Sequence, residues 1–195
     1  AENDLRNKVQ SGTLFVNYIG HGGEVGWAHE RILDLATINN WTNSPRLPVF
    51  MTATCEFSRY DDPSRTSAGE YALTNPSGAA IALMTTTRVV ISGPNETLNT
   101  YFIEFFLDRG SNNQRQRIGD FYLNTKNKMS AFSPGNAGNT RNFTLLGDPS
   151  VPFKIPFYNV KTDSLNGVSI SANTDTIKAL SVITVKGHME DESGN

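Results

Sequence analysis

The 195-residue sequence holds one cysteine, Cys55, and three histidines. A single cysteine excludes an internal disulfide and any metal centre built from several thiolates. No apolar run approaches the ~18 residues that a membrane-spanning helix needs. Seventeen Lys and Arg against nineteen Asp and Glu give a net charge of −2, which excludes a strong general attraction to nucleic acid or to an anionic membrane. The first residues carry neither a charged n-region nor an apolar h-region, so we expect no signal peptide.

Short apolar runs alternate with helical patterns along most of the chain. The runs predict buried strands, and the helical patterns repeat apolar residues at three- and four-residue spacing. We expect strands at 13–19, 47–54, 79–85 and 143–149, a loop at 131–142, and helices at 2–11, 29–39, 67–74, 95–109 and 114–130. This alternation predicts an α/β fold, with a mostly parallel sheet covered by helices on both faces.

The pattern changes after about residue 152. Helical periodicity disappears, and short β-prone segments follow at 168–170, 176–177 and 181–187 with turn signals between them. This succession of short β-prone segments and turns is typical of a β-sandwich, although a complete sandwich needs ~100 residues. We therefore expect a main domain at residues 1–152 and the opening strands of a second, β-rich domain at 153–195.

Two of the expected strands end in residues that carry chemistry. His21 follows strand 13–19 in the segment Gly20-His-Gly-Gly23, and Cys55 directly follows strand 47–54. The carboxyl ends of parallel strands meet at one sheet edge, where sites commonly form. An imidazole beside a thiol activates it as a nucleophile. Gly22 lets the backbone approach a substrate and turn an N–H group toward an oxyanion, and the Cys55 N–H is a natural second donor.

Other interpretations of these residues stay open at this level. A lone cysteine is commonly a small buried apolar residue, and a Gly-His-Gly-Gly segment is commonly a turn that contains an incidental histidine. A zinc site built from His21, Cys55 and His29 is a further alternative with less support, because the sequence has no closely spaced pair of metal ligands.

The polar segments near Cys55 supply further candidates. Asp61 and Asp62 follow Cys55 in a loop and are candidates to recognise a basic side chain or a cation, or they simply form a solvated turn before Pro63. Arg88 follows strand 79–85 and is a candidate to line a cleft at the same sheet edge, or it is simply a polar residue at the end of a strand. Glu24 either orients His21 or faces water.

Several motifs in fixed order resemble one family. They are Asn17-Tyr-Ile-Gly-His-Gly-Gly23, Trp27, Leu47-Pro-Val-Phe-Met-Thr-Ala-Thr-Cys55, Gly78-Ala-Ala-Ile-Ala-Leu-Met-Thr85 and Leu145-Leu-Gly-Asp-Pro-Ser150. The set resembles the gingipain-type cysteine peptidases, whose catalytic domain has a caspase-like fold. The stretches Thr54-Cys-Glu-Phe-Ser-Arg-Tyr-Asp-Asp-Pro63 and Thr85-Thr-Thr-Arg-Val-Val90 look more closely like the PorU-type sortases of the type IX secretion system.

The resemblance implies a role for individual residues. It makes His21 the catalytic histidine, Cys55 the nucleophile and Gly22 an oxyanion donor. It implies that no cofactor is needed for the chemistry, that a structural calcium ion is present in relatives, and that an Ig-like β-sandwich follows the catalytic domain. It also implies that the N-terminal part of the caspase-like domain is missing from this chain.

The resemblance further implies an activity and a place. The expected function is a cysteine endopeptidase and transpeptidase that removes C-terminal sorting domains from secreted proteins. It would act at the extracellular face of the outer membrane, beside other outer-membrane secretion components, with no role for nucleic acid and no transmembrane segment. The alternative is a non-catalytic surface scaffold or binding module that keeps the caspase-like fold.

Overall fold

The computed structural model describes residues 2–108, 116–153, 158–172 and 176–191. The chain divides into two compact units, residues 1–154 and 155–195, which are described separately. The elements of the first unit are α1 (Glu2–Ser11), β1 (Phe15–Ile19), β2 (Gly22–Gly23), β3 (Gly26–Trp27), β4 (Leu33–Asp34), α2 (Leu35–Asn39), β5 (Val49–Ala53), α3 (Ala68–Thr74), β6 (Ala82–Thr86), α4 (Ser92–Leu107), α5 (Ile118–Phe132), the 3-10 helix η1 (Pro134–Asn136), α6 (Ala137–Arg141) and β7 (Phe143–Gly147).

The first unit is built on a four-stranded sheet in the order β1-β5-β6-β7. β1 pairs with β5 and β5 with β6 in parallel, whereas β7 pairs with β6 in the antiparallel sense. Every residue of β5 and β6 is buried, as the continuous apolar runs predicted. The prediction of a mostly parallel sheet flanked by helices is confirmed, and the expected strand at 143–149 is present as β7, whose antiparallel pairing was not predicted.

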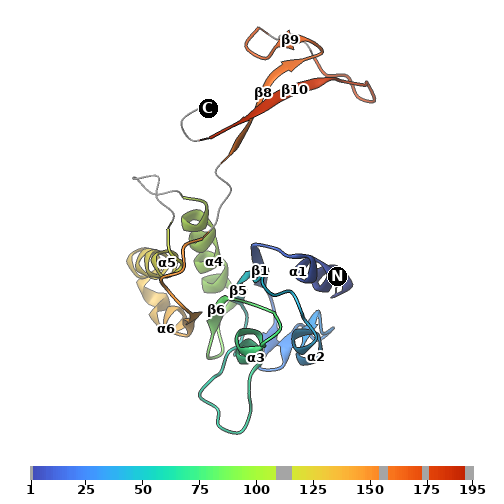
Figure 1. Cartoon of the computed structure of the whole chain (residues 1–195). Helices are drawn as coiled ribbons and strands as arrows, with labels where there is room; N and C mark the ends of the chain where they lie inside the picture. The colour runs from blue at the N-terminus through green and yellow to red at the C-terminus, as the bar shows by residue number, and fades with distance from the viewer. Residues whose placement is uncertain (1, 109–115, 154–157, 173–175, 192–195) are drawn as a thin grey trace. The chain divides into compact units, whose positions relative to one another are not determined.

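Helices cover both faces of this sheet (Figure 1): α4, α5 and α6 lie on one side, and α1, α2 and α3 on the other. Alternate residues of β1 serve the two faces, because successive side chains of a strand point in opposite directions. Phe15 stacks on Phe102 and Phe106 of α4, with ring centroids 5.6 and 4.8 Å apart. Val16 belongs to the opposite core, which contains the buried Trp27 and Trp41.

The predicted helix at 29–39 is wrong over most of its length. α2 covers only Leu35–Asn39, and β4 pairs with β3 before it. Ala28 and Arg31 have φ of 59° and 54°, a left-handed conformation that interrupts a right-handed helix. The helix α2 begins where the side chain of Asp34 accepts a hydrogen bond from the Thr37 N–H at 2.8 Å.

Smaller differences concern element ends and one loop. The segment 79–81 does not join strand β6, and Ala79 has φ of 72°. The expected loop at 131–142 contains η1 and α6. Helix α4 begins at Ser92, three residues before the expected start, while residues 109–115 lie outside the described residues. The capping box of α3 is present, since the Ser67 N–H donates to Glu70 at 2.7 Å.

The second unit contains a three-stranded antiparallel sheet in the order β10-β8-β9. Its strands are β8 (Asn159–Leu165), β9 (Val168–Ser169) and β10 (Val185–Glu190). The expected strand at 176–177 is wrong, because no strand includes Thr176 or Ile177, and β8 was not predicted. Three strands do not define an Ig-like sandwich, so that part of the interpretation stays a prediction. In the described parts of both units, no helix has the length and apolar character to cross a membrane.

Candidate active site

His21 and Cys55 leave the sheet at equivalent positions of neighbouring parallel strands. Ile19, the last residue of β1, pairs in register with Ala53, the last residue of β5. The Gly20 N–H extends this ladder by donating to the Ala53 carbonyl at 3.3 Å. Each candidate residue lies two positions beyond its strand, so both backbone segments leave from one edge of the sheet.

The backbone of His21 is fixed by two hydrogen bonds. Its carbonyl accepts from the Tyr18 hydroxyl at 2.7 Å and from the Ala28 N–H at 2.8 Å. Tyr18 is itself stacked on the buried Trp27, with ring centroids 4.4 Å apart, and burial raises the pKa of its hydroxyl. The backbone of His21 is therefore held in place by these contacts, while its side chain is exposed.

Cys55 is half-buried, and its thiol donates to the carbonyl of Val90 at 3.6 Å. Glu56, the next residue, also bonds to the segment that follows β6, because its N–H donates to the Arg88 carbonyl at 3.3 Å. Glu56 has φ of 51°, which turns the chain sharply just after the thiol. In the described part of the chain the thiol's hydrogen-bond partner is thus a backbone carbonyl, and pairing of Cys55 with His21 stays a prediction.

A buried chain of hydroxyl groups holds the loop that follows Cys55 against the sheet. Thr52 donates to Thr85 at 2.8 Å, and the Ser58 and Thr85 hydroxyls lie 2.9 Å apart. The Thr86 hydroxyl donates to the carbonyl of Thr54, the residue before the cysteine. These bonds tie the thiol's backbone to β6 on both sides of residue 55.

Gly22 lies where the two segments touch. The Ala28 N–H donates to the His21 carbonyl, which makes Gly22 and Trp27 a non-hydrogen-bonded pair of the β2–β3 ladder. The Gly22 N–H therefore points away from β3, as a donor to an oxyanion must. A Cβ atom at this position would lie 2.6 Å from the Thr54 hydroxyl and 2.8 Å from the Gly26 carbonyl.

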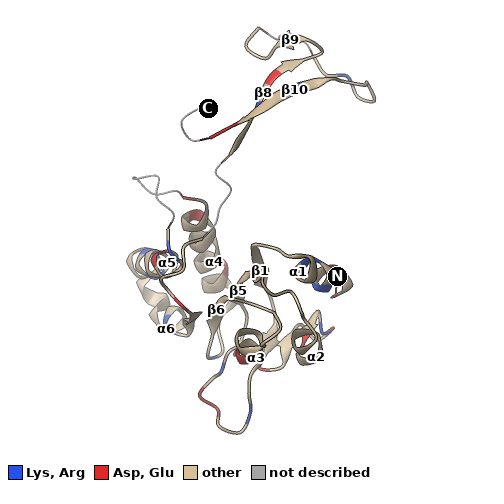
Figure 2. Ribbon diagram, viewed as in Figure 1, with Lys and Arg blue, Asp and Glu red and all other residues tan. Residues whose placement is uncertain are grey.

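Glu24 neither faces water nor is free to orient His21. One carboxylate oxygen binds Arg59 at 3.1 Å and the other binds Arg65 at 3.1 Å. Its side chain is only 12% exposed. Figure 2 shows both signs of charge along the segment between β5 and α3 that carries these arginines. Glu24 therefore ties the loop after Cys55 to the segment that carries His21, a role that sequence reasoning missed.

The three candidate substrate-binding residues bond to each other or to the loop that carries them. Arg88 forms a two-pronged ion pair with Asp61, with one contact at 2.9 Å, and this bond holds the pKa of Asp61 below its usual range. Asp62 accepts from the N–H and hydroxyl of Ser64, which also lowers its pKa. Asp61 and Arg88 compensate each other's charge, whereas among the described residues no basic side chain is in contact with Asp62.

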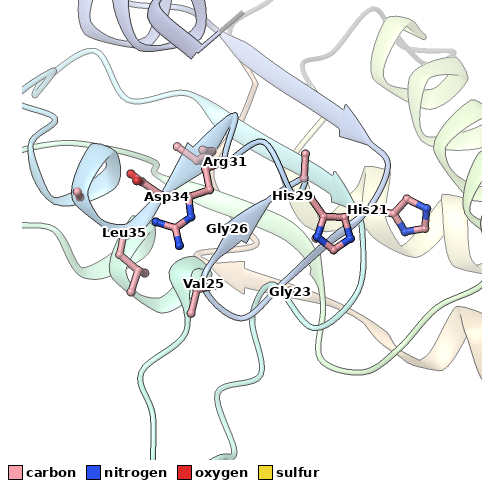
Figure 3. A pocket seen from close by; sticks show the side chains of 12 residues that line it. His21, Gly23, Val25, Gly26, His29, Arg31, Asp34 and Leu35 are labelled. Carbon is pink, nitrogen blue, oxygen red and sulfur yellow. The ribbon is translucent and has the colours of Figure 1, made fainter.

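A cavity of about 610 Å³ opens beside His21 (Figure 3). Its walls come from the β2–β3–β4 hairpins and from α2, and they include His21, Gly23, Val25, His29 and Arg31. Cys55 is not part of its lining. In the part of the chain that the structure describes, no three His, Cys, Asp or Glu side chains gather as metal ligands would, which counts against the zinc interpretation.

A family model settles the relationship that the motifs suggested. The model of peptidase family C25 matches residues 1–154, the whole of the first unit. The chain belongs to peptidase family C25. It therefore has the gingipain-like cysteine peptidase fold, with His21 and Cys55 in the segments described above. No curated protein matches the chain.

Solved structures agree on the fold. The chain is similar to the crystal structure of the Arg-specific cysteine proteinase gingipain R, with a TM-score of 0.70 at 20% identity over 83% of this chain and 39% of that one. It is also similar to the complex of Porphyromonas gingivalis RgpB pro- and mature domains, with a TM-score of 0.69 at 17% identity over 83% and 40%. The chain thus spans about two fifths of the length of these structures. At these identities the likeness shows the caspase-like fold alone.

Proposed function

We propose that this protein is a cysteine endopeptidase with transpeptidase activity, in which Cys55 is the nucleophile and His21 the proton carrier. The observation that carries the proposal is the parallel register of β1 and β5, which brings the segments of both residues to one sheet edge. Membership of peptidase family C25 supports the same chemistry.

The reaction follows from the residue types at that edge. The Cys55 sulfur attacks the scissile carbonyl, and the thiol proton passes to His21. The Gly22 and Cys55 N–H groups stabilise the oxyanion of the tetrahedral intermediate. The C–N bond then breaks, the leaving amine takes the proton from His21, and a thioester remains. Water or a second amine attacks the thioester and releases the cysteine. Attack requires that the thiol give up its contact with Val90.

The substrate class rests on the resemblance to PorU-type sortases in residues 54–63 and 85–90. We infer that the substrates are secreted proteins with C-terminal sorting domains, processed at the extracellular face of the outer membrane with other secretion components. Asp61, Asp62 and Arg88 would contact substrate there. The resemblance also implies a structural calcium ion. No group of three candidate ligand side chains gathers among the described residues, so no step is assigned to calcium.

The second candidate function is a non-catalytic surface scaffold. It is favoured by one observation, the hydrogen bond from the thiol to the Val90 carbonyl, which leaves the sulfur without a base in the described part of the chain.

The test is cleavage of a reporter protein that carries a C-terminal sorting domain, in the full-length protein and in single variants. We expect Cys55→Ala to abolish cleavage and His21→Ala to lower its rate by about 10²-fold or more. Ser130→Ala on the exposed side of α5 is the matched control. Addition of an amine nucleophile such as diglycine should convert part of the hydrolysed product to an amide, which mass spectrometry detects.

Two outcomes would overturn the proposal. Cleavage by Cys55→Ala near the wild-type rate would show that another residue is the nucleophile. Absence of cleavage by the wild type, with an unfolding midpoint equal to that of Cys55→Ala, would favour the scaffold.

A further inference from the structure

The cavity beside His21 has no role in the chemistry described above. At about 610 Å³ it lies in the range of pockets that hold small ligands, roughly 300–1,000 Å³. Figure 3 shows its labelled side chains coming from the turn between β2 and β3, from the turn after β3, from Asp34 and from the first turn of α2, with His21 at one end. The cavity therefore continues from the candidate catalytic histidine into a separate part of the surface.

The residues that line the cavity include one arginine, two histidines and one carboxylate, that of Asp34. Arg31 and His29 line it, and neither makes an ion pair in the part of the chain that the structure describes. Asp34 is the acidic side chain among the lining residues, but its carboxylate accepts the Thr37 N–H at the start of α2. That hydrogen bond, together with the charge of Arg31, lowers the pKa of Asp34. The Asp34 carboxylate is thus already used as a helix cap.

The remaining walls are apolar. Val25, Leu33 and Leu35 line the cavity with small residues between them. Such walls suit the methylene groups of a side chain, and the guanidinium of Arg31 suits a carboxylate at its end because it offers a planar fork of donors. Arg31 itself holds a left-handed backbone conformation, φ 54°, that arginine seldom adopts.

We infer that this cavity is a subsite for the residues on the leaving-group side of the scissile bond, where Arg31 and His29 select an acidic side chain. The inference rests on the proposed function. A histidine that gives its proton to the leaving amine lies on the leaving-group side of the carbonyl. The cavity that His21 lines therefore receives residues that follow the scissile bond.

The first experiment measures cleavage of a synthetic peptide library randomised at every position, with cut sites read by mass spectrometry. We expect Asp and Glu to be enriched at the first or second position after the cut, by about tenfold over Asn and Gln. Arg31→Ala should remove the enrichment, and Arg31→Glu should replace it with enrichment of Lys and Arg. Arg6→Ala, a change of an exposed arginine on α1, should keep it. No enrichment in the wild type, or an enrichment that survives Arg31→Ala, would overturn the inference.

A second experiment is independent of catalysis and uses the Cys55→Ala variant. The probes are N-acetyl-glutamate amide and its neutral analogue N-acetyl-glutamine amide at millimolar concentration. The chain has three histidines, so their ring signals resolve in a carbon–proton NMR spectrum. We expect the acidic probe to shift His21 and His29 but not His188, and Arg31→Ala to abolish the shift. Equal shifts with both probes, or none, would contradict the subsite even if the peptidase activity is present. If the wild type does not cleave the peptides but the NMR shifts of Cys55→Ala are as expected, only the proposed function is contradicted.

Discussion

Gly22 is fixed by its neighbours rather than by its own backbone angles. Its φ lies outside the left-handed range, yet a Cβ atom there would meet the Thr54 hydroxyl and the Gly26 carbonyl below 3 Å. Real Cβ atoms essentially never approach other atoms so closely. Gly23, the next residue, has nothing within 4 Å of an added Cβ. The same substitution at these two adjacent glycines therefore tests the effect of the clash, with Gly23 as the control.

We expect Gly22→Ala to destabilise the protein by about 1–3 kcal/mol, because the new methyl group overpacks the contact between the two segments. Gly23→Ala should be within about 0.5 kcal/mol of the wild type or slightly more stable, since alanine lowers the entropy of the unfolded chain. Urea denaturation measures both.

The same variant separates the structural role of Gly22 from the oxyanion role. Alanine keeps the backbone N–H, but the clash of its methyl group shifts the segment and turns that N–H away. If the Gly22 N–H stabilises the oxyanion, thioester formation in the folded fraction of Gly22→Ala therefore falls by about 10²–10³-fold. Unchanged thioester formation in that fraction, with a lower denaturation midpoint, would mean that Gly22 serves only the packing of the sheet edge.

At the scale of elements, one buried hydroxyl group joins β5, β6 and the loop after Cys55. Thr85 is fully buried and joins Thr52 and Ser58. Thr125 in α5 is equally buried, but its hydroxyl has no hydrogen-bond partner in the described part of the chain. The same substitution at these two positions therefore removes a network in one case and a buried unpaired group in the other.

We expect Thr85→Val to destabilise the protein by about 1–3 kcal/mol, because Thr52 and Ser58 each lose a buried partner. Thr125→Val should be neutral or stabilising, since valine has the same shape and needs no hydrogen bond. Thermal or urea unfolding of the two variants beside the wild type tests this. Equal effects of the two substitutions would contradict the account.

The fold was predictable where local patterns and burial agree. The continuous apolar runs at 47–54 and 79–85 contain the buried parallel strands β5 and β6, and the periodic aromatic residues of α4 and α5 pack against each other in the core. The segment 29–39 misled because Ile32, Leu35 and Ala36 have helical spacing. The hairpin β3–β4 takes the first part of it through left-handed residues that no periodicity reveals.

The candidate site was predictable in part for a related reason. The ends of parallel strands share a sheet edge whatever the detailed packing, so the positions of His21 and Cys55 followed from strand order alone. The pairing of Glu24 with Arg59 and Arg65 joins loops that are ~35–40 residues apart, and no local pattern indicates it. The cavity is formed by the β3–β4 hairpin, which the sequence analysis did not predict. The sequence pattern around Arg31 therefore did not indicate that this residue lines a pocket.

For the molecule as a whole, the first unit is a C25-family fold with an extensive core, and the second unit is different. Its sheet exposes apolar side chains such as Val160, Val185 and Met189. The Asp163 carboxylate hydrogen-bonded to His188 raises the pKa of that imidazole. His188 thereby provides a histidine control outside the C25 region.

The central claim is that His21 activates the Cys55 thiol, and the most direct measurement is the rate of Cys55 alkylation by iodoacetamide at pH 7. Mass spectrometry assigns the product without ambiguity because the chain has one cysteine. The thiolate is the reactive form, and an adjacent imidazole favours it. We therefore expect His21→Ala to slow alkylation by roughly tenfold or more, while His188→Ala leaves the rate unchanged. Equal rates in the wild type and in His21→Ala, with the same unfolding midpoint, would contradict the account.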